Sequence, residues 1–179
     1  MTRSDSLDAA CRCGKVVLEA HGAPIIGATC HCRSCQTAGT GFEAVEGAPP
    51  VLDARGGTEY LLYRKDRVAC TAGEAELVEH RLSPESATRR VVASCCNSPM
   101  FLEFSKGHWL SLYRARFTPE AAPPIEIRTM TADARDGAVL PGDVPNLAGH
   151  SGKFMWKLLT AWVAMGFRVP KVVGELRKL

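Results

Sequence analysis

The sequence predicts a mainly β fold of antiparallel sheets with a helix near the C-terminus. Short runs rich in β-branched and aromatic residues recur along the first two thirds of the chain, and Gly, Pro or Ser turns separate them. No long helical period lies between these runs. Regular short strands without intervening helices are typical of all-β or β-rich domains.

Six runs have the composition expected of strands. They are residues 15–20, 57–63, 75–82, 89–94, 100–104 and 109–117. Gly14 directly precedes the first run and allows the chain to turn tightly there. Residues 34–39, which follow a group of cysteines, are expected to form a single helical turn.

The composition changes after residue 117. Residues 118–151 are rich in Pro, Gly and Asp, which favour irregular chain, so we expect a linker or a wrapping loop. Residues 153–167 favour a helix that Pro170 ends, because apolar side chains recur every three or four positions. These side chains are Phe154, Leu158, Ala161, Trp162 and Met165. We expect this face to pack against the body of the chain, with a dimer contact or a membrane surface as the alternative.

The length and composition indicate one folded domain with extensions. The chain has 179 residues, of which 46% are hydrophobic and 23% are charged, and both fractions are ordinary for a globular protein. We therefore expect a β domain over residues 8–117, the Pro/Gly-rich loop over residues 118–151, and a C-terminal amphipathic helix and tail over residues 152–179.

Charge and hydropathy argue against two classes of partner. The net charge of +3 is small and the basic residues form no stripe, so no nucleic-acid partner is expected. The N-terminus lacks the apolar run of a secretory signal, and no segment reaches the roughly 18 consecutive apolar residues that span a bilayer. We expect a cytoplasmic protein without a membrane segment, and the sequence leaves its oligomeric state open.

The eight cysteines carry the strongest chemical signal. In a reducing compartment, clustered thiols are more often metal ligands or redox catalysts than disulfides. Thiolate is a soft ligand that suits zinc. Seven cysteines fall into three groups, each beside a turn signal: Cys11 with Cys13, Cys30 with Cys32 and Cys35, and Cys95 with Cys96.

Seven ligands divide into one closed site and one open site. Structural zinc sites are closed by four protein ligands, whereas catalytic sites keep three and leave a position for water or substrate. Cys30, Cys32 and Cys35 lie within one short segment and can converge alone, so we expect them to form the open, catalytic site. The two remaining pairs would then form a closed site that joins distant parts of a β domain.

Other interpretations apply to neighbouring residues. Cys70 stands alone on a strand-like run and is expected to be a buried thiol. His31 should point away from Cys30 and Cys32, its sequence neighbours, which favours a role outside the ligand set. Cys32 and Cys35 also form a Cys-x-x-Cys pair, so a redox function is an alternative, although no βαβ pattern surrounds it.

Three motifs together resemble a known family. The segments "CRCGKV", "CHCRSCQTAGTG" and a late cysteine followed by "NSPM" are similar to the signatures of the glutathione-dependent formaldehyde-activating enzyme (GFA) family, which includes centromere protein V. The resemblance covers roughly residues 8–117. It implies a β-tent of antiparallel sheets with a structural zinc at Cys11, Cys13 and the late cysteines. It also implies a second, open zinc site at the Cys30 group, linked to carbon–sulfur lyase chemistry.

The late motif departs from the family pattern. The family pattern of Cys-x-x-Cys would place its first ligand at Ala93, which cannot bind metal, and an adjacent pair, Cys95 and Cys96, stands there instead. Neighbouring side chains on an extended strand point to opposite faces, so both can bind one ion only where the chain bends. Residues 97–99 favour such a bend. Cys96 is the firmer of the two candidate ligands.

The sequence therefore predicts a zinc-dependent, carbon–sulfur lyase-like enzyme that acts on a thiol adduct, of the glutathione type, of a small aldehyde. Two zinc ions per chain are expected, and the second site is open to partial occupancy. Arg33 beside the cysteines is a candidate partner for a substrate carboxylate, or an ordinary solvated side chain. The alternative function is a non-catalytic zinc module whose surface binds a partner.

Overall fold

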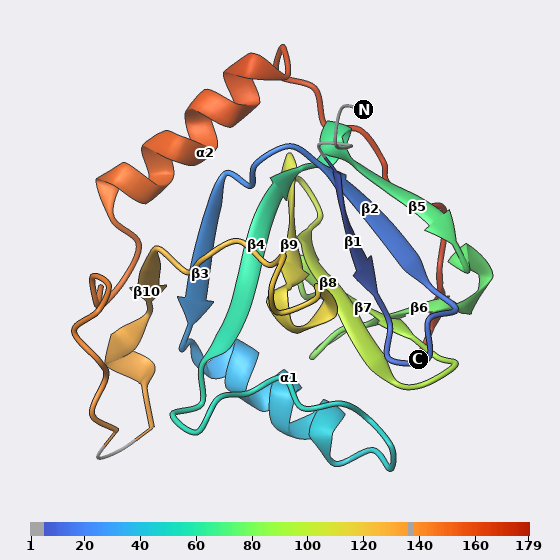
Figure 1. Ribbon diagram of the computed structural model, residues 1–179, viewed down its shortest axis with the longest axis horizontal. Coiled ribbons are helices and arrows are strands. Elements are labelled where there is room, and N and C mark those ends of the chain that lie inside the picture. The colour runs from blue at the N-terminus through green and yellow to red at the C-terminus, as the bar shows by residue number, and fades with distance from the viewer. Residues whose placement is uncertain (1–5, 136–137) are drawn as a thin grey trace.

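The computed structural model describes residues 6–135 and 138–179, and these residues form the mainly β fold that the sequence predicts (Figure 1). A three-stranded antiparallel sheet has the order β1-β2-β5, with bounds Ser6–Ala10, Val17–His21 and Val68–Ala72. An eight-stranded sheet has the order β10-β3-β4-β9-β8-β7-β6-β11. Its strands are, in that order, Ile127–Thr129, Ile26–Cys30, Thr58–Arg64, Trp109–Tyr113, Ser98–Phe104, Thr88–Ala93, Leu77–His80 and Arg177–Lys178.

The large sheet is antiparallel except at its two edges. β10 pairs in parallel with β3, and β11 pairs in parallel with β6. Each of the six predicted runs overlaps a strand, but β1, β3, β5, β10 and β11 were not predicted. β3 has the sequence IGATC, in which Gly and Ala give little strand signal, and the two edge strands depend on partners far away in the sequence. The Pro/Gly-rich segment 118–151 thus contributes an edge strand to the sheet.

Alternating side chains give the large sheet two different faces. On β4, Leu61 and Tyr63 belong to the core shared with the small sheet, which also contains Leu18 and Phe101. Tyr60 and Leu62 belong to a second cluster on the opposite face. The period of two along each strand therefore separates a closed core from the face that carries the helices.

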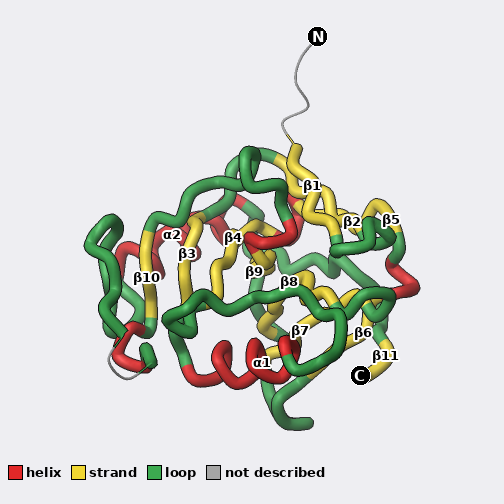
Figure 2. The backbone as a smooth tube through the Cα atoms, turned by 60° about the horizontal axis from the view of Figure 1, so that its bottom comes forward, coloured by secondary structure: helices red, strands yellow, loops and turns green. Residues whose placement is uncertain are grey.

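Both helices lie on this second face. Helix α1 (Arg33–Glu43) runs below the strands of the large sheet in Figure 2, and helix α2 (Gly152–Ala164) lies outside β3 and β10 in Figure 1. The prediction of a single turn at residues 34–39 was too short. Gly and Thr residues weaken the helix signal of α1, but packing of Ala38 and Phe42 on Val78 and Val92 stabilises it.

Helix α2 follows the predicted pattern. Ser151 caps its N-terminus by accepting a hydrogen bond from the Phe154 amide at 3.1 Å. The helix ends before Met165 and left-handed Gly166, ahead of Pro170. Phe154 and Leu158 are buried against the large sheet. Among the described residues, no helix is long and apolar enough to cross a bilayer.

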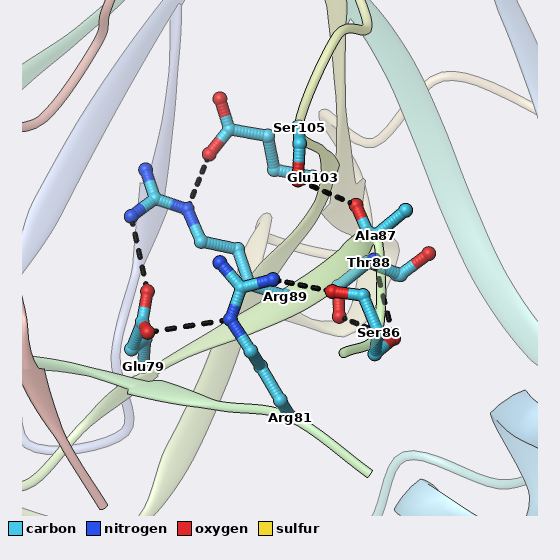
Figure 3. A network of polar contacts seen from close by, with 8 residues as sticks. All are labelled: Glu79, Arg81, Ser86, Ala87, Thr88, Arg89, Glu103 and Ser105. Atoms are coloured by element: carbon cyan, nitrogen blue, oxygen red, sulfur yellow. Dashed lines mark hydrogen bonds and ion pairs between the residues drawn. The ribbon is translucent and has the colours of Figure 1, made fainter. Parts of the chain in front are cut away.

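A charge network joins three strands at one end of the large sheet (Figure 3). Arg89 on β7 contacts Glu79 on β6 at 3.3 Å and Glu103 on β8 at 2.6 Å, and Arg81 completes the chain through Glu79. Glu103 also pairs with Lys65 at 2.5 Å, and both of these residues are buried. Glu103 is therefore the buried centre of the network.

We expect Glu103→Leu to lower the free energy of unfolding by about 3 kcal/mol, because it leaves the Lys65 ammonium buried without its partner. Chemical denaturation measures this loss. The double variant Lys65→Met with Glu103→Leu should recover most of it, and Arg81→Met, at the more exposed end of the network, should cost less than 1 kcal/mol or so. Equal losses for the Glu103 and Arg81 variants would contradict this account.

Candidate metal centres and the adjoining cavity

Four cysteines from two turns meet at the edge of the closed core. Cys11 and Cys13 lie in the turn after β1, and Cys95 and Cys96 lie in the turn between β7 and β8. Their sulfur atoms all lie within 4.8 Å of one another. The two turns are more than eighty residues apart in the sequence, as the Cys11–Cys95 separation shows. We call Cys11, Cys13, Cys95 and Cys96 the four-cysteine cluster.

The adjacent cysteines both reach the cluster because they occupy a turn. Residues 94–97 form the β7–β8 turn, and Asn97 takes a left-handed conformation with φ of 53°. Ser98 already belongs to β8, so the bend lies slightly earlier than predicted. On a turn, neighbouring side chains are not forced to opposite faces as they are on a strand.

The sulfur positions fit a tetrahedral metal site. Four thiolates at about 2.3 Å from a zinc ion are separated from one another by about 3.8 Å. The recorded Sγ–Sγ separations are 3.6 Å for Cys11–Cys13, 3.9 Å for Cys11–Cys95, 3.4 Å for Cys13–Cys95 and 4.0 Å for Cys95–Cys96. The cluster can therefore hold a metal ion with little movement.

Polar groups around this cluster favour thiolate at Cys96, whereas burial and the neighbouring Cys13 and Cys11 raise the pKa of Cys95. Although burial opposes it, hydrogen bonds from Ser98 and from the Cys13 backbone and side chain lower the pKa of Cys96 to about 6. The buried Arg116 lies nearby, and its Nε has no hydrogen-bond partner among the described residues. Burial lowers the pKa of Arg116, while Cys96 and Cys11 oppose that shift. A buried guanidinium with an unpartnered nitrogen is costly unless negative charge lies beside it.

Three further cysteines form a second cluster where β3 meets α1. Cys30 ends β3, Cys32 is the N-cap of α1, and Cys35 lies in its first turn. Their sulfur atoms lie within 4.8 Å of one another, and we call them the three-cysteine cluster. Three sulfur ligands leave one position free around a tetrahedral ion. The two clusters thus have the four-plus-three division that the sequence predicts.

The N-terminus of α1 favours negative charge in this cluster. The Cys35 amide donates a hydrogen bond to Cys32 Sγ at 3.4 Å, and the helix dipole adds positive potential. Hydrogen bonds from Cys30 and Cys35 lower the pKa of Cys32 to about 2. The same contacts with Cys32 and Cys35 raise the pKa of Cys30. The Cys35 amide and the helix N-terminus therefore favour thiolate at Cys32.

His31 points away from the cluster, as alternation predicts. Its side chain is fully buried, and both ring nitrogens lack a hydrogen-bond partner among the described residues. Burial lowers its pKa, with Asp53 opposing. The ring packs close to Gly57, where a Cβ atom would come within 2.8 Å of His31 Cε1. His31 belongs to neither ligand group.

Arg90 is a candidate site residue that the sequence analysis did not single out. It is 1% exposed, and its Nη2 donates to the Ser34 carbonyl at 3.0 Å and to the Ser34 hydroxyl at 2.8 Å. Nε and Nη1 have no hydrogen-bond partner among the described residues. Although burial lowers the pKa of Arg90, Tyr60, Tyr113 and Cys35 outweigh it and raise that pKa. The signal was present, because adjacent arginines on a strand place one on each face.

A cavity of about 520 Å³ opens beside the three-cysteine cluster. The large sheet, the first turn of α1 and one side of α2 form its walls. Tyr60 lies next to the cysteines, with its hydroxyl 3.7 Å from Cys35 Sγ. The wall residues beyond the cysteines include Leu62, Leu102, Trp109, Ser111, Phe154 and Leu158.

Two other candidates lie outside the cavity. The side chain of Arg33 is 89% exposed and faces Asp133 at 3.6 Å, so it is not part of the cavity wall. Cys70 on β5 is half-buried, where the sequence predicted a buried thiol, and it belongs to neither cysteine cluster. Its Sγ donates to the Ala72 carbonyl at 3.4 Å, in keeping with the prediction that it stands apart.

One comparison with known proteins matches the family that the motifs resemble. The sequence model of the glutathione-dependent formaldehyde-activating enzyme family matches residues 6–50. No protein with a curated description matches the chain. A crystal structure of a Rhodobacter sphaeroides protein from a structural genomics programme is similar, with a TM-score of 0.45 and 14% identity over 78% of this chain and 99% of that chain.

The matched residues contain one half of the four-cysteine cluster and all of the three-cysteine cluster. The similarity to the glutathione-dependent formaldehyde-activating enzyme family thus covers residues 6–50, which carry five of the seven clustered cysteines.

Proposed function

We propose that the protein is a zinc-dependent, carbon–sulfur lyase-like enzyme that acts on the thiol adduct of a small aldehyde. One observation carries the proposal: three cysteines with one coordination position to spare lie in the wall of a cavity. The four-cysteine cluster offers a complete ligand set and supports a structural role. An all-sulfur donor set favours zinc over the hard cations, which prefer oxygen.

The reaction itself needs few groups. In the adduct-forming direction, a carbon–sulfur bond forms between the thiol and the aldehyde carbon, and the thiol proton ends on the carbonyl oxygen; the lyase direction is the reverse. A zinc ion held by Cys30, Cys32 and Cys35 would supply a site that stabilises thiolate at neutral pH. The Tyr60 hydroxyl, 3.7 Å from Cys35 Sγ, is a hydrogen-bond donor for an oxygen in the cavity.

Arg90 has a positioning role in this proposal. Three thiolates and one divalent ion carry a net negative charge, and the buried guanidinium beside Cys35 balances it. Its hydrogen bonds to Ser34 also hold the first turn of α1, which carries the cysteines. Arg90 therefore acts through the cluster, without contact to the reacting atoms.

Metal analysis tests the two sites. Protein purified without chelator should contain two zinc ions per chain by mass spectrometry of the metal content. Cys13→Ala and Cys35→Ala should each reduce the content to about one, because each removes a ligand from one cluster only. Cys70→Ala is the matched control and should keep two. Loss of zinc in the Cys70 variant, or none in the other two, would show that the clusters are not the ligand sets.

Turnover tests the catalytic role. Zinc-loaded protein should accelerate the exchange of formaldehyde with its thiol adducts, measured by exchange NMR with both glutathione and 2-phenylethanethiol. Cys32→Ala should reduce this acceleration about 100-fold, because it removes a ligand of the open site. Its circular dichroism spectrum should be unchanged. If neither thiol reacts faster with the zinc-loaded protein, the lyase-like function is wrong and a non-catalytic zinc module is favoured.

Replacing Arg90 tests its positioning role. Arg90→Met should weaken zinc binding at the three-cysteine cluster about 10- to 100-fold, the usual effect of losing a group that supports metal ligands. Competition with a chromogenic chelator measures the affinity. Arg89→Met removes the neighbouring charge on the other face of β7 and should leave the zinc affinity unchanged. Equal zinc affinities in the Arg90 variant and the parent would remove Arg90 from the site.

A further inference from the structure

The cavity beside the three-cysteine cluster is built for an apolar molecule. Leu62, Leu102, Phe154 and Leu158 form its interior, and all four side chains are buried. Trp109 adds an aromatic wall from β9. A volume of about 520 Å³ is in the range of small-molecule sites, roughly 300–1,000 Å³.

The cavity offers very little charge to a ligand. Among the described residues that line it, none is Asp, Glu or Lys, and Arg90 is the single guanidinium. Ser34 occupies Arg90 Nη2, and only Nε and Nη1 have no partner among the described residues, so Arg90 can pair with one anionic group at most. His150 is exposed and stacks on Phe154 with ring centroids 4.9 Å apart. A ligand with several charged groups would therefore lose hydration here without finding partners.

Helix α2 makes the cavity apolar, and several contacts hold it in place. His108 Nε2 lies 2.8 Å from the Leu158 carbonyl, and the His108 ring stacks on Trp162 at 5.6 Å. Lys157 pairs with Glu126 at 2.7 Å. The wall formed by Phe154 and Leu158 is thus part of the folded molecule, and it bounds the cavity beside the cysteines.

We infer that the thiol that enters this site is apolar, either an aliphatic or aromatic thiol or the aldehyde adduct of one. Its sulfur lies toward the three-cysteine cluster, and its hydrocarbon part lies between the large sheet and α2. Glutathione, with two carboxylates and an ammonium group, finds at most one opposite charge in the cavity. The role of the sulfur in this inference rests on the proposed function. The apolar character of the cavity rests on the wall residues alone.

Ligand-observed NMR on the zinc-loaded full chain tests the inference with three probes: 2-phenylethanethiol, glutathione, and n-propylbenzene, which resembles the first but has no sulfur. We expect 2-phenylethanethiol to bind at least ten-fold more tightly than glutathione, equivalent to about 1.4 kcal/mol. We expect n-propylbenzene to bind saturably and to compete with 2-phenylethanethiol. Equal or tighter binding of glutathione, or no saturable binding of n-propylbenzene, would overturn the inference.

Two neighbouring leucines on α2 provide a matched pair of variants. Leu158→Gln places an amide in the cavity and should weaken both apolar probes about ten-fold, whereas glutathione should change less than two-fold or so. Leu159 is 43% exposed and outside the cavity, so Leu159→Gln should change none of them. If Leu158→Gln does not fold, Phe104→Gln at a 44% exposed wall position replaces it, with the same expected selectivity. Equal changes in probe affinity for the variants at positions 158 and 159 would contradict binding of the probes in the cavity.

The probes separate this inference from the proposed function. If both apolar probes bind but no thiol speeds formaldehyde exchange, the lyase-like function is wrong, whereas the inference of an apolar binding cavity holds. If glutathione binds more tightly than 2-phenylethanethiol and reacts, the function stands and the inference about the thiol fails.

Discussion

The structure depends on the alternation of side chains across the eight-stranded sheet, because the two faces of this sheet lie in different environments. One face closes a core with the small sheet, and the other supports α1, α2 and the cavity. A shift of one residue in register would exchange these faces and carry Arg90 into the apolar core. The paired contacts of β7 and β8, with Arg89 bound to Glu103 on one face and Arg90 beside the cysteines on the other, favour a single register.

Negative charge on sulfur explains features that packing alone does not. Arg90 and Arg116 are both buried and both have nitrogens without hydrogen-bond partners in the described part of the chain. Each lies beside a different cysteine cluster. A neutral thiol would give such a cation little compensation, whereas metal-bound thiolates retain net negative charge. The positions of the two arginines therefore favour thiolate over neutral thiol at the clusters beside them.

The sequence contained the ligand groups but little of what surrounds them. The spacing of Cys30, Cys32 and Cys35 predicted one cluster because the three lie on one local segment. A closed site needs four ligands, so the two remaining cysteine pairs were predicted to share the other site. The cavity was not predictable in this way, since Leu62, Leu102 and Leu158 come from three distant segments and are ordinary apolar residues in sequence. Helix α1 was underestimated for the same reason: Gly39 is a poor helix former, but its missing Cβ lets Leu52 approach.

The different positions of the two clusters give them different chemical possibilities within one fold. The four-cysteine cluster joins the turn after β1 to the β7–β8 turn, so a bound ion there links two segments that are distant in sequence and limits local opening. The three-cysteine cluster joins only β3 and the first turn of α1, which are continuous in the chain, so an ion adds little to the tertiary fold. Because three ligands leave a position open and a cavity adjoins them, the second cluster is the one suited to exchange ligands without loosening the fold.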